Sequence, residues 1–218
     1  MGIKVFGAAL SPFVRKVRVA VKEKNLDYEH VHVDPFKKRP DDYDELSPFG
    51  RIPAFQDGEH KMADSGVICT YLEGKYPEPA LYPTDPYEKA QCLWFEKFGD
   101  YELAPLATFG VFRNRVVMRL MGNNCDEDKV NEVLDSKLPP LLDYLEAQIG
   151  DNEFIVGGQF TVADIAIATH FVNMSLGGET IDASRWPKSA KYVDGILARP
   201  TFAKLSEAEH GFVKKYLG

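Results

Sequence analysis

The sequence has few cysteines and no long apolar run. No stretch approaches the roughly 20 apolar residues that span a bilayer, and the N-terminus lacks the basic and apolar segments of a secretory signal. The three cysteines, Cys69, Cys92 and Cys125, are far apart and form no CxxC pair. This usage argues against a disulfide framework and against dithiol redox chemistry. We therefore expect a soluble, cytoplasmic protein that does not bind membranes.

Clustered positive charge is also scarce. The formal net charge is −7, and the one basic cluster is Lys37-Lys38-Arg39. Binding to nucleic acid requires many cations that neutralise phosphates, so a nucleic-acid partner is not expected. The basic cluster is large enough for one small carboxylate.

Two further chemistries find no support in the sequence. His30, His32 and Asp34 alternate as metal ligands on one strand face would, but no further ligand is evident. No GxSxG motif is present, which argues against a serine hydrolase. We predict neither a metal site nor a cofactor.

Strand and helix patterns alternate over the first third of the chain. Strands are predicted over 3–7, 28–34 and a hairpin at 52–63, and helices over 11–24 and 65–76. The hairpin signal is Asp57-Gly58, and Asn25 is a plausible left-handed helix terminator. A β-α-β unit followed by β-β-α predicts a small mixed sheet covered by helices.

Four prolines between Pro77 and Pro86 mark a linker, because proline cannot continue a helix. Beyond them the patterns are helical, with helices expected at about 87–121, 126–149, 162–175, 187–198 and 201–208. Pro105 predicts a kink or break in the first of these. We therefore expect an α/β domain over 1–78, a linker over 79–86 and an all-α domain over 87–218.

Several residues in the first domain suggest a binding site. Ser11 stands before Pro12 at a helix start, where a serine caps the helix and its hydroxyl could also stabilise an anion such as a thiolate. Ile52-Pro53 predicts a sheet-edge position or a cis turn, with backbone groups free to pair with an extended peptide.

A second helix start follows the hairpin. Ser65 has N-cap character, and Asp64 beside it could accept hydrogen bonds from an ammonium group. Taken alone, each of these features also has an ordinary structural role. Together with the basic cluster they suit an extended peptide with a central thiol, two terminal carboxylates and one amine, which describes glutathione.

At this point the sequence resembles a known family. "SPFVRKVRVAV", "SPFGRIPAFQDGEHKMADSGVICTYLEGKY", "GGQFTVADIAIA" and "ARPTFAKL" resemble the cytosolic glutathione S-transferases, particularly their serine-type phi, theta and related bacterial classes. The resemblance covers nearly the whole chain. It implies a thioredoxin-like N-terminal domain, an all-α C-terminal domain, a homodimer, and conjugation of glutathione to hydrophobic electrophiles.

The resemblance also implies roles for particular residues. Ser11 matches the serine that hydrogen-bonds the glutathione thiolate. The implied glutathione contacts are Lys38, Arg39, Arg51, Ile52, Pro53, Asp64 and Ser65, where Arg51 replaces the usual Gln and Asp64 the commoner Glu. The implied electrophile pocket contains Leu10, Phe13, Phe36, Phe109, Phe112, Arg113 and Arg115. Phe49 matches an aromatic that inserts into the partner subunit.

Alternatives remain open at this stage. A non-catalytic binding module with the same fold could have lost Ser11 or Ser65, and both are present. A glutathione-dependent oxidoreductase would carry Cys in place of Ser11, and an isomerase would start its helix with Ser-Ser-Cys. The sequence does not distinguish a glutathione transferase from a glutathione-dependent peroxidase. Thr161-Val162-Ala163-Asp164 resembles a capping box with a folding role.

Overall fold

The computed structural model describes residues 2–218, and the chain forms two compact units, Met1–Tyr82 and Pro83–Gly218. The first unit contains a sheet and the second is helical. Within the described residues, no helix is both long and apolar enough to cross a membrane.

The first unit is built on a four-stranded mixed sheet in the order β2-β1-β3-β4. The strands are β1 (Ile3–Phe6), β2 (Tyr28–Val31), β3 (Ala54–Asp57) and β4 (His60–Ala63). β1 pairs in parallel with β2 and antiparallel with β3, and β3 pairs antiparallel with β4. This topology confirms the predicted β-α-β and β-β-α order. β2 ends at Val31, so His32 and Asp34 lie beyond the strand that the alternation predicted.

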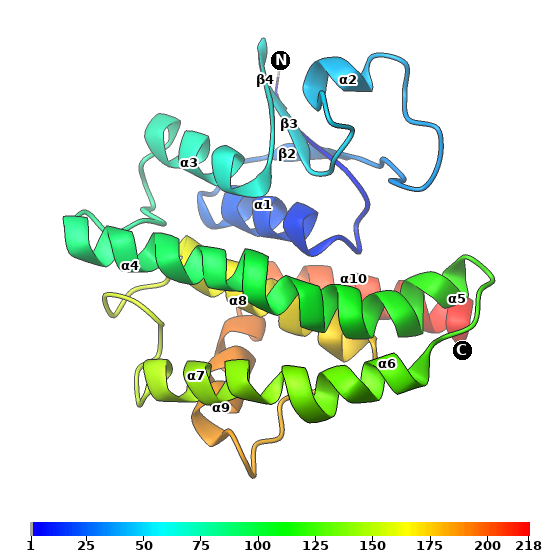
Figure 1. Cartoon of the computed structure of the whole chain (residues 1–218). Helices are drawn as coiled ribbons and strands as arrows, with labels where there is room; N and C mark the ends of the chain where they lie inside the picture. The colour runs from blue at the N-terminus through cyan, green and yellow to red at the C-terminus, as the bar shows by residue number, and fades with distance from the viewer. Residues whose placement is uncertain (1) are drawn as a thin grey trace. The chain divides into compact units, whose positions relative to one another are not determined.

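Helices α1 (Pro12–Glu23) and α3 (Ser65–Lys75) pack against each other beside the sheet (Figure 1). α1 forms because its valines recur on one face, where Val14, Val17 and Val21 are fully buried. Asn25 follows the helix with a φ of 56°, which confirms the predicted left-handed terminator.

A short helix that the sequence pattern did not indicate, α2 (Tyr43–Leu46), lies next to β3 and β4. It has four residues, too few for a hydrophobic period to be visible. Its two buried side chains, Tyr43 and Leu46, form a small apolar cluster with Val33 and Ala54. This cluster fixes the segment between β2 and β3 to the sheet.

The segment after α3 is fastened by a buried lysine. The Lys24 side chain is fully buried, and its ammonium donates to the carbonyl oxygens of Tyr76 at 2.7 Å and Pro79 at 3.0 Å. It also lies 2.7 Å from Oε2 of Glu73. Because carbonyls at a helix C-terminus lack intrahelical donors, Lys24 supplies one to the end of α3.

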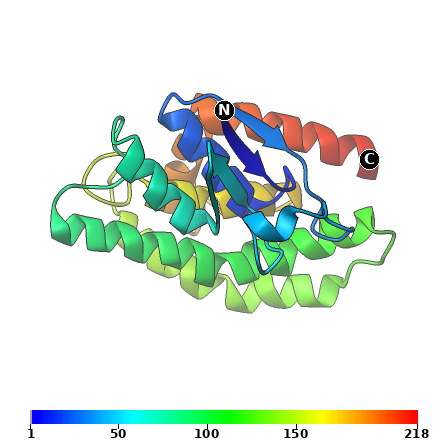
Figure 2. The same cartoon turned by 90° about the horizontal axis from the view of Figure 1, so that it is seen from above.

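The second unit starts with one continuous helix, formed by α4 (Pro86–Lys97), η1 (Phe98–Val117) and α5 (Met118–Leu120) (Figure 2). η1 is a π-helix in which the Met118 N–H bonds to the carbonyl of Arg113, five residues back. The prediction for Pro105 was a kink or a break; Pro105 lies inside η1, so a break is wrong, and the kink stays a prediction. Wider hydrogen bonding of this kind lets a helix continue past a residue that lacks an N–H donor.

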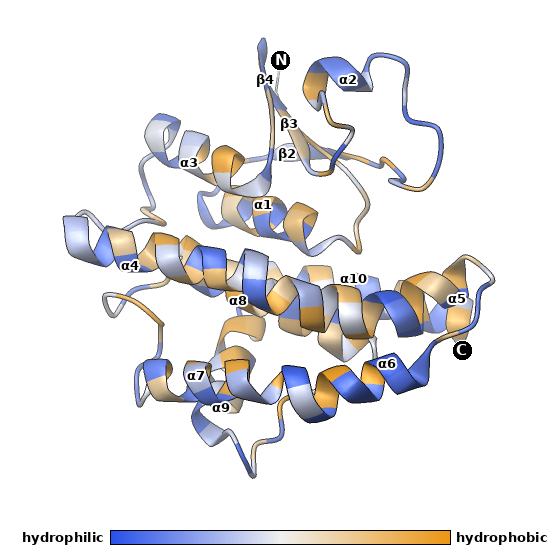
Figure 3. Cartoon of the chain, viewed as in Figure 1, coloured by the Kyte–Doolittle hydropathy of each residue, from blue (hydrophilic) through white to orange (hydrophobic). Residues whose placement is uncertain are grey.

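The other helices of this unit are α6 (Glu127–Glu132), η2 (Val133–Lys137), α7 (Pro139–Ile149), α8 (Val162–Leu176), α9 (Pro187–Leu197) and α10 (Pro200–Leu217). Figure 3 shows that hydrophilic and hydrophobic residues are interspersed along α6 and the segment that follows it, and the valines Val130 and Val133 there are buried. α10 continues to Leu217, well beyond the predicted end at residue 208, because its apolar spacing persists past Gly211.

α8 is the central helix of this unit, and nearly all of its residues are buried. A side chain at Gly99 would place its Cβ 2.9 Å from the backbone of Ala166, so glycine allows η1 to approach α8 closely. The predicted capping box is confirmed at the start of α8, where the Thr161 backbone and hydroxyl donate to Oδ2 of Asp164. Asp164 also accepts from the Ile155 N–H and the Tyr192 hydroxyl, both within 2.9 Å.

Candidate functional site

The strand register gathers the predicted site residues at one edge of the sheet. Phe6 pairs with Ala54, and Ala54 pairs with Ala63, so these three residues form a row across β1, β3 and β4. β1 and β4 end at this row, and β3 begins there. The loop with Ser11, the turn with Pro53 and the start of α3 therefore meet at the same sheet edge.

Ser11 caps α1, as predicted. Its backbone is extended, and its Oγ accepts a long hydrogen bond of 3.4 Å from the Val14 N–H. Pro12 is the first helical residue. No acceptor for the Ser11 hydroxyl proton occurs among the described residues, so this proton is available for an external acceptor.

Gly7 joins the Ser11 loop to the Ile52-Pro53 turn. Its φ is +147°, and a Cβ at this position would lie 2.4 Å from Cγ2 of Val14 and 3.2 Å from Cβ of Ile52. Only glycine fits this close approach. His30 adds a second restraint, since its Nε2 lies 2.9 Å from the Gly7 carbonyl oxygen. Burial, followed by the charge of Arg18, lowers the pKa of His30 and favours its neutral form.

The Ile52-Pro53 peptide is cis, which confirms the predicted cis turn. Ile52 lies outside the strand ladder, and its backbone groups join no hydrogen bond within residues 2–218. The preceding residue is held on both sides: the Arg51 N–H donates to Oγ of Ser47 at 3.0 Å, and the Tyr43 hydroxyl donates to the Arg51 carbonyl at 2.9 Å. Ile52 thus presents a free donor and acceptor from a fixed loop.

The start of α3 differs in one respect from the prediction. Asp64, and not Ser65, is the N-cap, and its Oδ1 accepts from the N–H groups of Gly66 at 2.9 Å and Val67 at 3.1 Å. A carboxylate satisfies two adjacent donors better than one hydroxyl can, which explains the one-residue shift. The second Asp64 oxygen has no partner among the described residues.

Asp64 has a φ of +78°, in a region that residues other than glycine rarely adopt. Backbone strain of this kind concentrates at functional positions. It turns the chain so that Ser65, the first residue of α3, is nearly buried at the helix start. Because the Asp64 side chain occupies the next two N–H groups, the Ser65 N–H and hydroxyl are the donors that remain there.

The basic cluster divides in two. Arg39 lies against the loop before Ile52, since a Cβ on Gly50 would meet its guanidinium carbon at 2.5 Å. Lys38 is highly exposed and pairs with Asp41 at 2.9 Å. The structure therefore brings Arg39 toward the sheet-edge loops, together with Arg51, and directs Lys38 to solvent.

This sheet edge combines two helix N-termini, two guanidinium groups, free backbone groups at Ile52 and two serine hydroxyls. Helix N-termini and guanidinium groups both favour anions. Among these groups, the second carboxylate oxygen of Asp64 is the anionic acceptor, and it is suited to bind an ammonium group. Within residues 2–218, no group of three or more His, Cys, Asp or Glu side chains could hold a metal ion.

Residues that sequence reasoning missed are those that hold the loops. Three such residues, Gly7, Tyr43 and Ser47, contact the residues around the cis turn. None of them is among the predicted site residues. A glycine at the end of the predicted strand 3–7 was the one available signal for Gly7. Tyr43 and Ser47 gave none, because their contacts depend on tertiary structure.

The residues predicted to contact an electrophile have different surroundings. Leu10 and Phe13 are half-buried in the first unit, and Phe36 is 58% exposed. In the helical unit, Phe109 and Arg113 line a cavity of about 500 Å³ between η1 and the α6–η2 segment. Phe112 is buried, and Arg115 binds Glu127 and Glu179.

The comparisons with known proteins agree with this architecture. The family model of the glutathione S-transferase N-terminal domain matches residues 5–80, and that of the C-terminal domain matches residues 112–209. A glutathione S-transferase of Hyoscyamus muticus is 33% identical over an alignment of 216 positions, which covers 95% of this chain and 99% of that protein. Glutathione S-transferase PARB of Nicotiana tabacum is 32% identical, with 94% and 97% of the two chains covered.

Solved structures show the same fold. The crystal structure of a glutathione S-transferase from Rhodospirillum rubrum F11 matches with a TM-score of 0.84 at 26% identity, covering 93% of this chain and 91% of that one. The fold is thus a thioredoxin-like sheet domain followed by a helical domain. The chain belongs to the glutathione S-transferase family.

Proposed function

We propose that this protein conjugates glutathione to hydrophobic electrophiles. The observation that carries the proposal is the convergence of Ser11, the Ile52-Pro53 turn and the Asp64-Ser65 helix start at one edge of the sheet. These groups match the functional groups of glutathione in number and type. Relatives named glutathione S-transferase over nearly the whole chain support it.

In the proposed reaction, the Ser11 hydroxyl donates a hydrogen bond to the glutathione sulfur. This bond and the N-terminus of α1 favour the thiolate, and the thiol proton passes to water. The thiolate then attacks an electrophilic carbon, forming a C–S bond. The leaving group departs with its bonding electrons, or an activated double bond takes a proton from water. Lowering the thiol pKa by about two units corresponds to roughly 2.7 kcal/mol.

The remaining residues bind the peptide. The Ser65 N–H and hydroxyl hold the γ-glutamyl carboxylate, and Asp64 accepts from its ammonium group. The backbone of Ile52 pairs with the cysteinyl residue, as an added strand would. Arg39 binds the glycyl carboxylate, with Lys38 and Arg51 nearby. Leu10, Phe13 and Phe36 supply apolar contacts to the electrophile.

The test is calorimetric titration of the pure protein with glutathione, together with turnover of a panel of electrophiles. We expect Ser65→Ala to weaken glutathione binding roughly tenfold or more, because a charge-assisted hydrogen bond is worth about 1.5–3 kcal/mol. Ser136→Ala, an exposed serine in η2, is the matched control and should not change the affinity. Unchanged affinity in Ser65→Ala removes this residue from the site, and absence of turnover with every electrophile contradicts the transferase.

We further propose a cytoplasmic homodimer. Phe49 is 88% exposed in the loop between α2 and β3. In the helical unit Tyr87, Trp94 and Tyr101 are exposed at spacings of seven residues, and so lie on one side of the long helix. Exposed aromatic residues that recur on one face are typical of protein interfaces, and a second copy is the partner that family resemblance suggests.

A further inference from the structure

His30 lies beside the proposed site but takes no part in the proposed reaction. It belongs to the alternating trio His30, His32 and Asp34, and the part of the chain that the structure describes holds no group of three metal ligands. Its half-buried side chain projects from β2, an outer strand of the sheet. Its Nε2 lies 2.9 Å from the Gly7 carbonyl oxygen. Since a carbonyl can only accept, Nε2 carries the hydrogen and donates.

The surroundings of His30 favour a neutral ring. Tyr28, two residues earlier, points to the same face of β2, and its hydroxyl accepts from Nε of Arg18 on α1 at 2.9 Å. His30 therefore lies on the sheet face next to α1. Burial, followed by the charge of Arg18, lowers its pKa. A neutral imidazole with its hydrogen on Nε2 has a single N–H group, and the Gly7 carbonyl receives it.

Gly7 is held by β2 through both of its backbone groups. Its N–H donates to the Val31 carbonyl at 3.0 Å, and its carbonyl accepts from His30. Gly7 lies beyond the end of β1, and its carbonyl has no backbone partner among the described residues. Because glycine has few torsional restrictions, the peptide between Gly7 and Ala8 can rotate unless this carbonyl is held. His30 supplies the contact that fixes the peptide plane.

The orientation of this peptide determines where Ser11 lies. The Ala8 carbonyl accepts from the Ser11 N–H at 3.1 Å and closes the turn before α1. The Ser11 Oγ in turn accepts from the Val14 N–H. A rotation of the peptide after Gly7 redirects the chain at Ala8, and it therefore moves the carbonyl that holds Ser11.

We propose that His30 is a positioning residue for the thiolate, because its hydrogen bond to Gly7 fixes the direction of the Ser11 hydroxyl. This inference rests on the proposed function, in which that hydroxyl donates to the glutathione sulfur. His30 itself contacts neither glutathione nor the reacting atoms. It acts through the geometry of the donor, since a hydrogen bond weakens steeply when its angle or length departs from the optimum.

The first test uses the full chain without glutathione and two variants of similar side-chain length. His30→Gln keeps an N–H donor, and His30→Met has none. In hydrogen-exchange measurements, the Ser11 N–H should exchange at least about tenfold faster in His30→Met than in wild type, and His30→Gln should stay near wild type. Equal exchange in all three proteins would overturn the proposal.

The second test is ultraviolet titration of the bound glutathione thiol. His30→Met should raise the pKa of this thiol by about half a unit to one unit, which is roughly a threefold to tenfold loss of thiolate near neutral pH. His30→Gln should restore most of the thiolate. A Gln variant that behaves like the Met variant would assign the effect to the ring or its charge and overturn the proposal.

The two possible failures are distinguishable in the same titration. A wild-type protein that binds glutathione without lowering its thiol pKa contradicts the proposed function and, with it, this role of His30. A lowered thiol pKa that His30→Met leaves unchanged contradicts the role of His30 alone.

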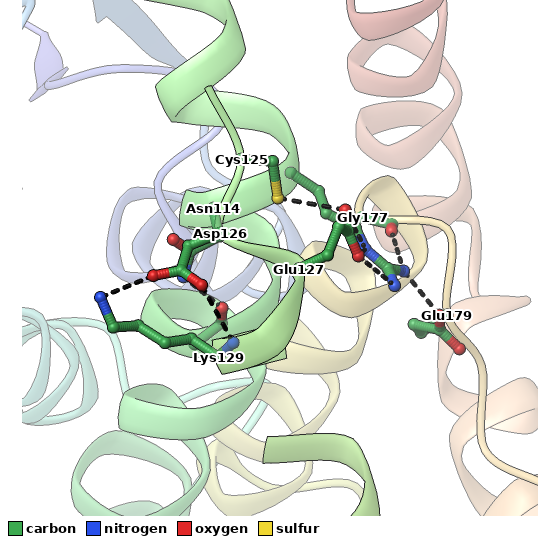
Figure 4. Close-up of polar contacts among 9 residues, drawn as sticks. Asn114, Cys125, Asp126, Glu127, Lys129, Gly177 and Glu179 are labelled. Carbon is green, nitrogen blue, oxygen red and sulfur yellow. Dashed lines mark hydrogen bonds and ion pairs between the residues drawn. The ribbon is translucent and has the colours of Figure 1, made fainter. Parts of the chain in front are cut away.

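A similar bond in the helical unit provides the control. The Asn114 side-chain amide donates to the Gly110 carbonyl at 2.6 Å, and Figure 4 shows Asn114 among the polar side chains of η1 and α6. Asn114→Leu removes this donor and should change neither the exchange of the Ser11 N–H nor the thiol pKa. If it changes both as His30→Met does, the effects come from a general loss of stability, and the proposal is overturned.

If His30→Met does not fold, nitrogen NMR of the wild-type imidazole tests the same point. We expect a neutral ring near pH 7 with its hydrogen on Nε2, because the Gly7 carbonyl needs a donor there. A neutral ring with its hydrogen on Nδ1 would overturn the proposal.

Discussion

The Ser11 hydroxyl caps α1 and, in the proposed reaction, also donates to the glutathione thiolate; these two roles respond differently to pH. As a cap it accepts from the Val14 N–H at 3.4 Å, a length that indicates a weak bond. Loss of the cap alone should cost about 1 kcal/mol of stability or less. Donation to a thiolate, in contrast, affects the pKa of bound glutathione.

We expect Ser11→Ala to raise the pKa of bound glutathione and to lower turnover near neutral pH. The deficit should shrink as pH rises, because bulk ionisation then supplies the thiolate. The measurement is the pH–rate profile of both proteins with an aryl electrophile, together with ultraviolet titration of the bound thiolate. Superimposable profiles would leave Ser11 as a cap only.

For single residues, the sequence predicted which residues belong to the site better than it predicted which hydrogen bonds each one makes. Ser11 and the cis turn at Pro53 could be predicted because serine and proline have strong positional preferences. The sequence could not predict that Asp64 and not Ser65 is the N-cap of α3, because this depends on a positive φ that the fold imposes on Asp64. Contacts such as Tyr43 with Arg51 exist only after the sheet has formed.

At the level of the elements, α3 has two polar attachments: Lys24 of the segment after α1 binds its C-terminus, and Asp57 of β3 binds its side chains. Lys24 should contribute strongly at the C-terminus, because its buried ammonium has three oxygen partners. We expect Lys24→Met to lower the free energy of unfolding by about 3–5 kcal/mol, since it removes the cation beside Glu73, which keeps the Leu81 N–H as a donor, and leaves the Tyr76 and Pro79 carbonyls without their Lys24 donor. Denaturant unfolding measures this. Lys22→Met, on the same helix with an exposed partner, should change stability by less than about 1 kcal/mol.

The other attachment of α3 predicts a pH dependence. Burial by itself raises the pKa of Asp57, but hydrogen bonds from Lys75, Tyr76 and Tyr71 outweigh it, and the net pKa is lowered. A lowered carboxyl pKa stabilises the fold above the unfolded pKa of about 4, and this stability is lost as pH falls through the folded value.

Asp57→Asn should therefore be less stable than wild type at pH 7, and its stability should fall less steeply in acid. Chemical unfolding at a series of pH values below about 5 checks this. Asp135→Asn, at an exposed position in η2, serves as the control and should follow the wild-type curve. Parallel curves for Asp57→Asn and wild type would exclude Asp57 as the source of the acid sensitivity.

The elements themselves were largely predictable, because β1, α1, the hairpin and α8 carry clear periods and caps. The failures have local causes. α2 is too short for a period, η1 continues past Pro105 by adopting π-helical bonding, and α10 continues past Gly211. In each case tertiary packing decides where the local signal is weak.

For the whole molecule, the prediction concerns association. We expect Phe49→Ala to weaken the proposed homodimer by roughly 2 kcal/mol or more, the usual scale for loss of an aromatic anchor. Sedimentation or light scattering over a range of concentrations measures this, with Phe212→Ala, at an exposed aromatic on α10, as the control. A wild-type protein that remains monomeric at all concentrations would end the proposal.

The row formed by Phe6, Ala54 and Ala63 has a consequence for how such a protein can diversify. One residue inserted within β1, β3 or β4 would slide one loop by about 3.3 Å and turn its side chains to the opposite face. An insertion between β2 and α2 would leave the row unchanged. Evolution, or a designer who grafts a new ligand preference, can therefore lengthen the basic loop freely while the three strand lengths stay constant.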